Sequence, residues 1–267
     1  MNEQRNGCVG HTFVRIISVF IILQMILIGT SAWAQDNKRD LIITTLYDNS
    51  SSNKELKTGL GYSCLIQGAE KAILFDIGDS DAVKNMDKLK IKPESIDVLV
   101  ISHDHYDHID GLSAFSKRNK HAVIHDVPHD SVKICEDVFT TGAMGTNPRE
   151  HNPFIMGTVE NALIIRTAKG LVIITGCAHP GIVEIVQRAK SLSPKDPVYL
   201  VMGGFHLVDE NKGSVKKIAS DLKNENVQKV APSHCTGGMA KSVFKDVFGA
   251  DFIPGDVGKP IIIEGAL

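Results

Sequence analysis

Short aliphatic runs and amphipathic segments alternate along most of the chain. Runs that are rich in Ile, Leu and Val and bounded by glycine or polar residues predict β-strands. The predicted strands cover residues 41–47, 62–67, 71–76, 96–101, 121–127, 162–167, 171–175, 197–202, 227–231 and 261–263. Turns at 68–70 and at Gly170 predict that two pairs of neighbouring strands form hairpins.

Apolar residues at helical spacing occur between several of these runs. Ser80 predicts the N-cap of a helix, because apolar residues follow it at helical spacing. Further helices are predicted after Gly181, over 215–222 and over 239–247. Hairpins followed by helices that each return to a strand predict an α/β (α+β) fold, in which packed sheets carry helices on their outer faces.

The N-terminal residues have the pattern of a secretory signal. Basic residues precede an apolar stretch over 16–29, and the small residues Ala32 and Ala34 follow it at a typical cleavage position. This pattern predicts a signal peptide over 1–34, a single mature domain over 35–267, and a periplasmic or secreted location. The alternative is an uncleaved membrane anchor, because the uncharged stretch just reaches the ~20 residues that span a bilayer. After cleavage, no stable membrane contact is expected.

The charge and cysteine content exclude several classes of protein. The 267 residues include 29 basic and 31 acidic side chains, so no broad electrostatic attraction to nucleic acid is expected. Of the five cysteines, Cys8 lies in the predicted signal, and the others are too few to form a disulfide scaffold in a domain of this length. Histidine stands out instead, because most of the 11 histidines lie between His103 and His206.

A dense group of metal-ligand residue types follows the predicted strand over 96–101. Three histidines and three aspartates fall within residues 103–110, including the pattern His103-x-His105-x-Asp107-His108. Imidazole and carboxylate ligands suit zinc, iron or manganese. The alternative is a polar loop that caps a helix, but a cap needs only one such side chain. The density of ligand types therefore favours a metal site.

Three later histidines occupy a similar place in the pattern. His179, His206 and His234 each follow a predicted strand and lie in a loop that contains glycine. Side chains that follow strands commonly meet at one edge of a sheet and carry function. All three are therefore predicted to join the site of His103.

These motifs resemble the metallo-β-lactamase superfamily, whose signature is His-x-His-x-Asp-His after a strand with two later histidines. The motifs over 74–78, 176–179, 203–207 and 233–237 are most similar to one branch of it. That branch comprises the 7,8-dihydropterin-6-yl-methyl-4-(β-D-ribofuranosyl)aminobenzene 5'-phosphate synthase-like metal-dependent hydrolases. The resemblance implies a four-layer αββα sandwich of two mixed β-sheets.

The resemblance also implies a set of ligands for one or two divalent metal ions, with zinc as the first expectation and iron or manganese as alternatives. It assigns one trio of residues to each ion: His103, His105 and His179 to the first, and Asp107, His108 and His234 to the second. Asp76 resembles the aspartate that orients a ligand histidine from behind. Its alternative role is that of a turn or cap residue.

His206 marks a departure from the commonest pattern of the superfamily. Many members have an aspartate at this point that bridges the two metal ions, but an imidazole nitrogen has one lone pair and cannot bridge. His206 is therefore open to three roles: a metal ligand, a proton donor, or a contact to a substrate phosphate. Asp209 is a possible substitute three residues further on.

The expected activity is hydrolysis by an exported metal-dependent enzyme. A metal-activated water would attack a small anionic substrate, either phosphorylated or ester-like, with Asp107 and His206 as the catalytic residues. Asp107 would orient the water or accept its proton, and His206 would act as the acid. The alternatives are a transferase or synthase of the family branch, a β-lactamase or lactonase, and a metal-binding module without turnover. The oligomeric state stays open.

Other residues have two or more interpretations. The step Gly237–Gly238 is either an anion site at a helix N-terminus or a plain helix entry. The loop 140–157 is either a lid or a surface connection. Three roles are open to Cys177 and Cys235: a disulfide, metal binding, or packing in the core. Packing is favoured. The recurrent histidines at 121, 125 and 129 are expected in a strand and turn rather than in a site.

Overall fold

The computed structural model describes residues 38–145 and 158–267. The predicted signal peptide over 1–34 and most of the predicted lid over 140–157 lie outside the described residues. Within the part that is described, no helix has both the length and the apolar character needed to cross a membrane. The unit that carries the candidate chemistry extends from Arg39 to Leu267.

The first sheet has six strands in the order β12-β1-β2-β3-β4-β5. The sheet is mixed, because β3, β4 and β5 run parallel whereas the other neighbours are antiparallel. Its strands are β1 (Leu41–Tyr47), β2 (Ser63–Gln67), β3 (Ile73–Phe75), β4 (Val98–Val100), β5 (Val123–His125) and β12 (Pro260–Ile263). The predicted hairpin around 68–70 joins β2 to β3.

The second sheet repeats this design with the order β11-β10-β9-β8-β7-β6. Strands β9, β10 and β11 run parallel, and β6 to β9 pair as antiparallel neighbours. Its strands are β6 (Lys133–Cys135), β7 (Val138–Thr140), β8 (Leu163–Thr167), β9 (Gly170–Thr175), β10 (Val198–Gly204) and β11 (Lys229–Ser233). Gly170 has φ +121, and a Cβ there would lie 2.4 Å from Pro197 O, so this turn requires glycine.

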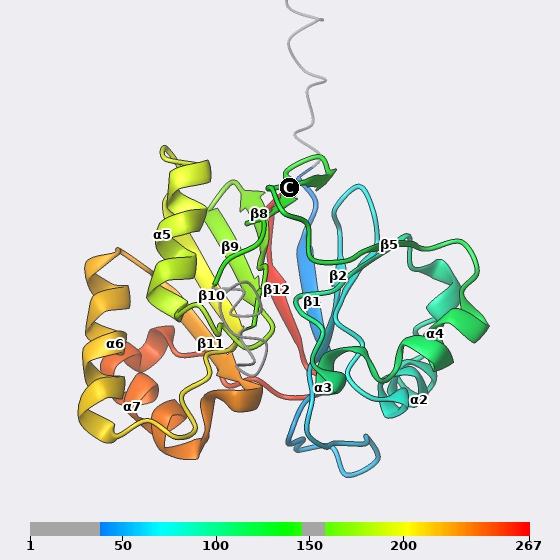
Figure 1. Cartoon of the computed structure of the whole chain (residues 1–267), viewed down its shortest axis with the longest axis horizontal. Coiled ribbons are helices and arrows are strands. Elements are labelled where there is room, and N and C mark those ends of the chain that lie inside the picture. Colours follow the sequence, from blue (N-terminus) through cyan, green and yellow to red (C-terminus); the bar gives the residue numbers. More distant parts are fainter. Residues whose placement is uncertain (1–37, 146–157) are drawn as a thin grey trace, which may run out of the picture. The chain divides into compact units, whose positions relative to one another are not determined.

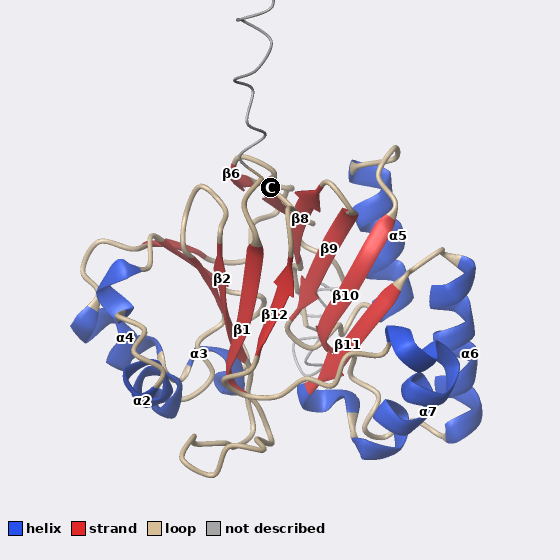
Figure 2. Ribbon diagram, turned by 180° about the vertical axis from the view of Figure 1, so that it is seen from behind, coloured by secondary structure: helices blue, strands red, loops and turns tan. Residues whose placement is uncertain are grey.

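Helices cover the outer face of each sheet (Figures 1 and 2). On the first sheet these are α2 (Ser80–Lys88) and α4 (Leu112–Arg118), with the 3-10 turn η1 (Pro93–Ser95), whereas the short helix α3 (Tyr106–Ile109) lies at the ends of the strands. On the second they are α5 (Ile182–Leu192), α6 (Lys212–Asn224) and α7 (Gly238–Phe248), with the 3-10 turns η3 (His234–Thr236) and η4 (Gly249–Asp251). The chain therefore forms the expected αββα arrangement of two mixed sheets.

Three buried clusters hold the four layers together. The central cluster packs the sheets face to face, with Phe75 and Val100 from the first and Val172 and Met202 from the second. A second cluster lies between the second sheet and helices α5 to α7, and a third lies between the first sheet and helices α2 and α4. Because side chains alternate along a strand, one face of each sheet packs against the other sheet and the opposite face packs against helices.

The start of α2 corrects one detail of the sequence prediction. Ser80 is the first helical residue, and the N-cap is Asp79, whose carboxylate accepts a hydrogen bond from the amide of Asp81 at 2.9 Å. Both residue types are good caps, so local sequence does not choose between them. The sequence analysis also did not predict the short strands β6 and β7 or the short helices α3 and α4.

Replacing Asp79 by Ala is expected to lower the free energy of unfolding by about 1 kcal/mol, because an amide of the first turn of α2 loses its acceptor. Ser80→Ala is the matched control and should change it by less than about 0.5 kcal/mol. Urea unfolding curves with an unchanged slope would measure both. A larger loss in Ser80→Ala than in Asp79→Ala would restore Ser80 as the cap.

Candidate metal centre

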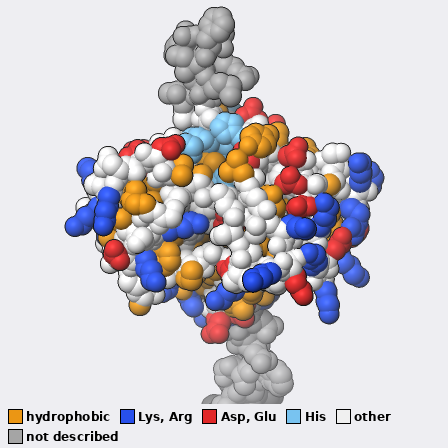
Figure 3. Space-filling view, turned by 90° about the horizontal axis from the view of Figure 1, so that it is seen from below, with side chains coloured by type: hydrophobic (Ala, Val, Ile, Leu, Met, Phe, Trp, Pro, Cys, Tyr) orange, Lys and Arg blue, Asp and Glu red, His pale blue; other side chains and the backbone are white. Residues whose placement is uncertain are grey.

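The site residues all follow the carboxyl ends of strands. Asp76 follows β3, the loop from His103 to Asp110 follows β4, and His179 follows β9. His206 and His234 come directly after β10 and β11. Because these strands belong to two sheets that face each other, their ends deliver side chains to one shared edge, where ligands commonly bind in α/β folds. Figure 3 shows histidine side chains gathered in one patch on the molecule.

The structure brings together each trio of ligands that the resemblance implied. His103, His105 and His179, here called the first trio, have ligand atoms within 4.8 Å of one another. Asp107, His108 and His234, the second trio, meet the same limit. The trios are adjacent, since the rings of His103 and His108 have centroids 4.2 Å apart.

Each histidine of the two trios has one ring nitrogen occupied by a protein partner. Four of these contacts are at Nδ1, and the contact of His105 is at Nε2. The pairs are His103 with Ser102 at 2.8 Å, His105 with Thr158 at 3.1 Å, His108 with Asp76 at 2.7 Å, His179 with Glu160 at 2.9 Å and His234 with Asn49 at 3.0 Å. Such partners fix the tautomer and leave the other nitrogen free to bind a metal.

Asp76 occupies the position that the resemblance gave to a supporting carboxylate. Its side chain is fully buried and accepts hydrogen bonds from the amide and hydroxyl of Ser102, both at 2.7 Å. The same carboxylate is paired with Nδ1 of His108. Burial would lower the pKa of His108, but the charge and hydrogen bond of Asp76 outweigh it and raise that pKa.

Glu160 is a second supporting carboxylate, which the sequence analysis missed. It is fully buried and accepts backbone hydrogen bonds from Cys177, Ala178 and His179 as well as the contact from the His179 ring. Burial would raise the pKa of Glu160, but these hydrogen bonds from His179 and the backbone lower it to about 2. The only sequence signal was one acidic residue just before a predicted strand.

Two buried nitrogens aim at the centre without a hydrogen-bond partner. They are Nε2 of His103 and Nε2 of His234, in residues that are 0% and 3% exposed. Burial and the neighbouring His108 lower the pKa of His103 to about 2, so its ring stays neutral and keeps a lone pair. Unpaired polar atoms in a buried place are costly, and a bound cation would satisfy both. The residues present therefore fit a metal centre.

Asp107 supplies the negative charge of the second trio. Its Oδ2 lies 3.3 Å from Nε2 of His234 and 3.7 Å from Nε2 of His108. Burial raises the pKa of Asp107, but the close approach of the His234 ring and the charge of His108 lower it well below its usual range. Asp107 is consequently a carboxylate at neutral pH, available as a ligand or as a proton acceptor.

His206 lies on the open side of the centre. Its side chain is exposed, and its ring centroid is 4.4 Å from that of His179. It joins neither trio, although it has a ligand atom within 4.8 Å of those of Cys177 and His179. Asp209, the possible substitute, belongs to none of the metal-ligand groups found among the described residues.

Cys177 and Cys235 both carry free thiols close to the histidines. The sulfur of Cys177 lies 3.2 Å from Nε2 of His108, and both cysteines share one potential ligand group with His234. A hydrogen bond between the two thiols raises the pKa of Cys177 and lowers that of Cys235. They form no disulfide, and Cys177 is 3% exposed, which agrees with the packing favoured by the sequence, while both thiols also lie within reach of a metal site.

Several site residues have left-handed backbone conformations. Asp76, Ala178, His206 and His234 have φ values of 55, 64, 50 and 46 degrees. Residues other than glycine rarely adopt this region, and each such residue costs on the order of 1–3 kcal/mol. Strain of this kind concentrates where the surrounding structure must aim a side chain.

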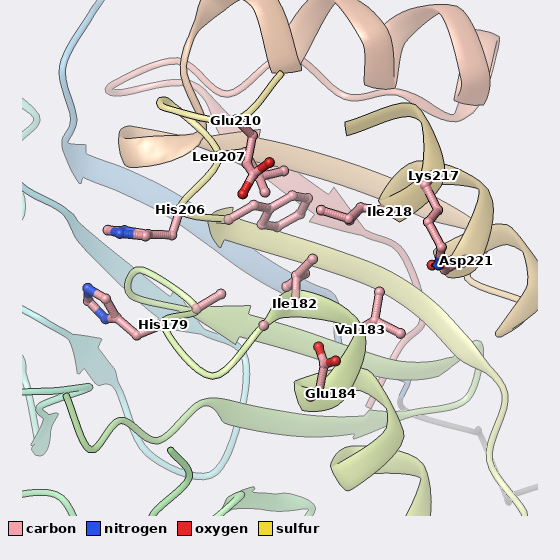
Figure 4. A pocket seen from close by; sticks show the side chains of 13 residues that line it. His179, Ile182, Val183, Glu184, His206, Leu207, Glu210, Lys217, Ile218 and Asp221 are labelled. Carbon is pink, nitrogen blue, oxygen red and sulfur yellow. The ribbon is translucent and has the colours of Figure 1, made fainter. Parts of the chain in front are cut away.

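A pocket of about 420 Å³ opens beside the metal centre, between α5 and α6. His179 and His206 lie at one end of it, and Lys217 and Asp221 lie at the other (Figure 4). Its apolar lining comes from Ile182, Val183, Phe205, Leu207 and Ile218. The charged residues of its lining are one lysine, Lys217, and three acidic residues, Glu184, Glu210 and Asp221.

The chain therefore has two features together: an αββα fold of two facing mixed sheets, and a histidine-rich candidate metal site at the ends of their strands. The chain belongs to the metallo-β-lactamase superfamily, whose family model matches residues 56–145. A Methanocaldococcus jannaschii protein named 7,8-dihydropterin-6-methyl-4-(beta-D-ribofuranosyl)-aminobenzene-5'-phosphate synthase is 30% identical to it over 280 residues. That match covers 82% of this chain and 95% of the relative.

Solved structures share the same architecture. Tm1679, described as a metal-dependent hydrolase of the β-lactamase superfamily, has a TM-score of 0.68 and 25% identity, with 84% of this chain and 99% of that chain covered. The short form of human tRNase Z has a TM-score of 0.54 at 14% identity, covering 82% of this chain and 98% of that one, and supports the fold alone.

Glu160→Gln is expected to lower the free energy of unfolding by about 3 kcal/mol, because three backbone amides and the His179 ring lose a buried carboxylate acceptor. It should also weaken metal binding by about 10- to 100-fold, since His179 loses the group that orients it. Urea unfolding and metal titration would measure the two effects. The exposed Glu264→Gln is the control, and a Glu160 variant that matched it would contradict this role.

Proposed function

We propose that the chain is a metal-dependent hydrolase that acts on a small phosphorylated or ester-like substrate. The observation that carries this proposal is the convergence of two ligand trios whose histidines are each oriented by a second protein group. Zinc suits these nitrogen and carboxylate ligands, and iron and manganese are the alternatives.

The metal-binding residues would be the first and second trios. When bound, divalent cations lower the pKa of a coordinated water to about 7 and polarise phosphoryl or carbonyl oxygens. Asp107, which is ionised and faces the second trio, would orient the attacking water and accept its proton. His206, on the open side next to the pocket, would give a proton to the leaving group.

The pocket between α5 and α6 suits a substrate that has an anionic group at one end and an uncharged organic part at the other. The anionic group would lie at the cations, and the remainder would extend past His206 along the apolar lining. Because Lys217 is paired with Asp221 at 2.6 Å, the pocket offers little positive charge of its own. A neutral or hydrogen-donating organic body therefore suits it better than a second anion.

A second candidate is a synthase or transferase, favoured by the coverage of the named relative from Methanocaldococcus jannaschii. Export of the mature chain over 35–267 to the periplasm or medium is also part of this proposal, supported by the signal pattern over 1–34. An exported enzyme would meet substrates outside the cytoplasm, which favours hydrolysis over a biosynthetic role.

Purified chain should contain divalent metal and hydrolyse at least one substrate in a screen of phosphomonoesters, phosphodiesters, lactones and β-lactams. His103→Ala and His179→Ala should each abolish this turnover and reduce bound metal, because each removes a ligand of the first trio. His129→Ala is the control, since that side chain is 98% exposed. Bound metal without turnover of any substrate would favour a binding module instead.

His206→Ala is expected to leave the metal content unchanged and to slow substrates with poor leaving groups by about 10²–10⁴-fold, because such groups need a proton donor. Substrates that release p-nitrophenolate should react at nearly the wild-type rate. Metal analysis and paired kinetics on the two kinds of substrate would measure this. Loss of one metal ion per chain would show that His206 is a ligand and would contradict the acid role.

A further inference from the structure

Among residues 38–145 and 158–267, no carboxylate shares a potential ligand group with members of both trios. A carboxylate can bind two cations at once, but His206 cannot fill that role because an imidazole nitrogen has one lone pair. Nor does Asp209, which follows it, join any group of potential ligands within residues 38–145 and 158–267. The group that does lie between the trios is the thiol of Cys177.

The sulfur of Cys177 is near ligand atoms of both trios. It lies within 4.8 Å of those of His103 and His179 from the first trio and of His108 and His234 from the second. Within the described chain, no other cysteine shares groups with members of both trios. Cys177 is 3% exposed, so the sulfur has little access to solvent.

The distance from this sulfur to His108 matches that between two ligands of one ion. Zn–N bonds of about 2.0 Å and Zn–S bonds of about 2.3 Å place two tetrahedral ligands about 3.5 Å apart. The observed separation between Sγ of Cys177 and Nε2 of His108 is 3.2 Å. The other nitrogen of His108 is held by Asp76, so Nε2 is the nitrogen that faces the sulfur.

The backbone holds Cys177 firmly in this position. Its amide donates to Glu160 at 2.9 Å, and Glu160 also binds the next two amides. A Cβ on Gly204 would lie 3.2 Å from Cα of Cys177 and 2.3 Å from Gly176 O, so the strand β10 packs directly against this loop. Independently, the Nε2 atoms of His103 and His234 are buried without a hydrogen-bond partner, and each of these histidines shares a potential ligand group with Cys177.

We propose that the Cys177 thiolate is the protein ligand shared by the two metal ions, in place of the bridging carboxylate. This rests on the metal centre of the proposed function. On metal binding the S–H bond breaks, its proton passes to the buffer, and two sulfur–metal bonds form from separate lone pairs of the sulfur. A thiolate in this place selects zinc, iron or cobalt and disfavours magnesium, which prefers oxygen ligands.

Cobalt(II) titration of the metal-free wild-type chain tests the proposal without any substitution. Sulfur–cobalt bonds give a charge-transfer absorption band in the near ultraviolet that nitrogen and oxygen ligands do not give. With a shared sulfur, the first and second equivalents of cobalt should add similar amounts of this band. Electron paramagnetic resonance of the chain with two cobalt ions should also show coupling between them.

The possible results separate this proposal from the proposed function. Two bound cobalt ions without a sulfur band would overturn the role of Cys177 and leave the hydrolase standing. A band that grows over one equivalent only would mean a ligand to a single ion, which also overturns the shared role. Failure to bind cobalt would overturn both proposals. The full band without hydrolysis in the substrate screen would support Cys177 and overturn the hydrolase.

Variants identify which sulfur is responsible. Cys177→Ser is expected to lose the band while circular dichroism remains that of the wild type, because a serine hydroxyl fits the same space. Cys235→Ser is the matched control near the centre and should keep the band, and Cys64→Ser is a buried control in the central cluster. Loss of the band in Cys235→Ser alone would assign the sulfur to Cys235 and overturn the proposal. If Cys177→Ser does not fold, the wild-type titration together with Cys235→Ser decides, because a shared-sulfur band that persists in Cys235→Ser excludes that thiol.

Discussion

Two buried carboxylates, Asp76 and Glu160, carry the arrangement on which the rest of the site depends. Asp76 follows β3 in the first sheet and holds His108 together with Ser102. Glu160 precedes β8 in the second sheet and holds His179 together with three backbone amides. Removing one partner of such a buried pair typically costs about 3–5 kcal/mol, because a charge is left without compensation. Each sheet therefore contributes one fixed carboxyl group around which its histidines are placed.

The left-handed backbone conformations at the strand ends also serve to place the side chains of the site. A side chain that leaves a strand would ordinarily point above or below the sheet, and the left-handed residues Asp76, Ala178, His206 and His234 redirect the chain toward the edge. The extensive packing of the two sheets and their helices stabilises these conformations. Without that packing the loops would relax, and the imidazoles would separate.

Much of the fold could be predicted from the sequence, because its strands are aliphatic runs and its long helices carry regular apolar stripes. A metal site could be predicted because the motif from His103 to His108 is dense and the later histidines follow strands, whereas the division into two trios came from the family resemblance. The role of Glu160 could not be predicted, because most of its partners are backbone amides, and these do not show in the spacing of residue types along the sequence. The central position of Cys177 could not be predicted, because it depends on the left-handed turn at Ala178. Strands β6 and β7 could not be predicted either, because three residues are too few to show an alternation of apolar and polar side chains.

The pairing of β1 with β12 constrains how the protein is made. Strand β12, residues 260–263, lies beside β1 at 41–47, so the first sheet is completed only after nearly the whole described chain has left the ribosome. The centre likewise waits for His234, whose amide is held by Asp48 at the end of β1. A partly synthesised chain thus has the His103 motif without the residues that complete the site, so selective binding of a cation there would require the folded chain.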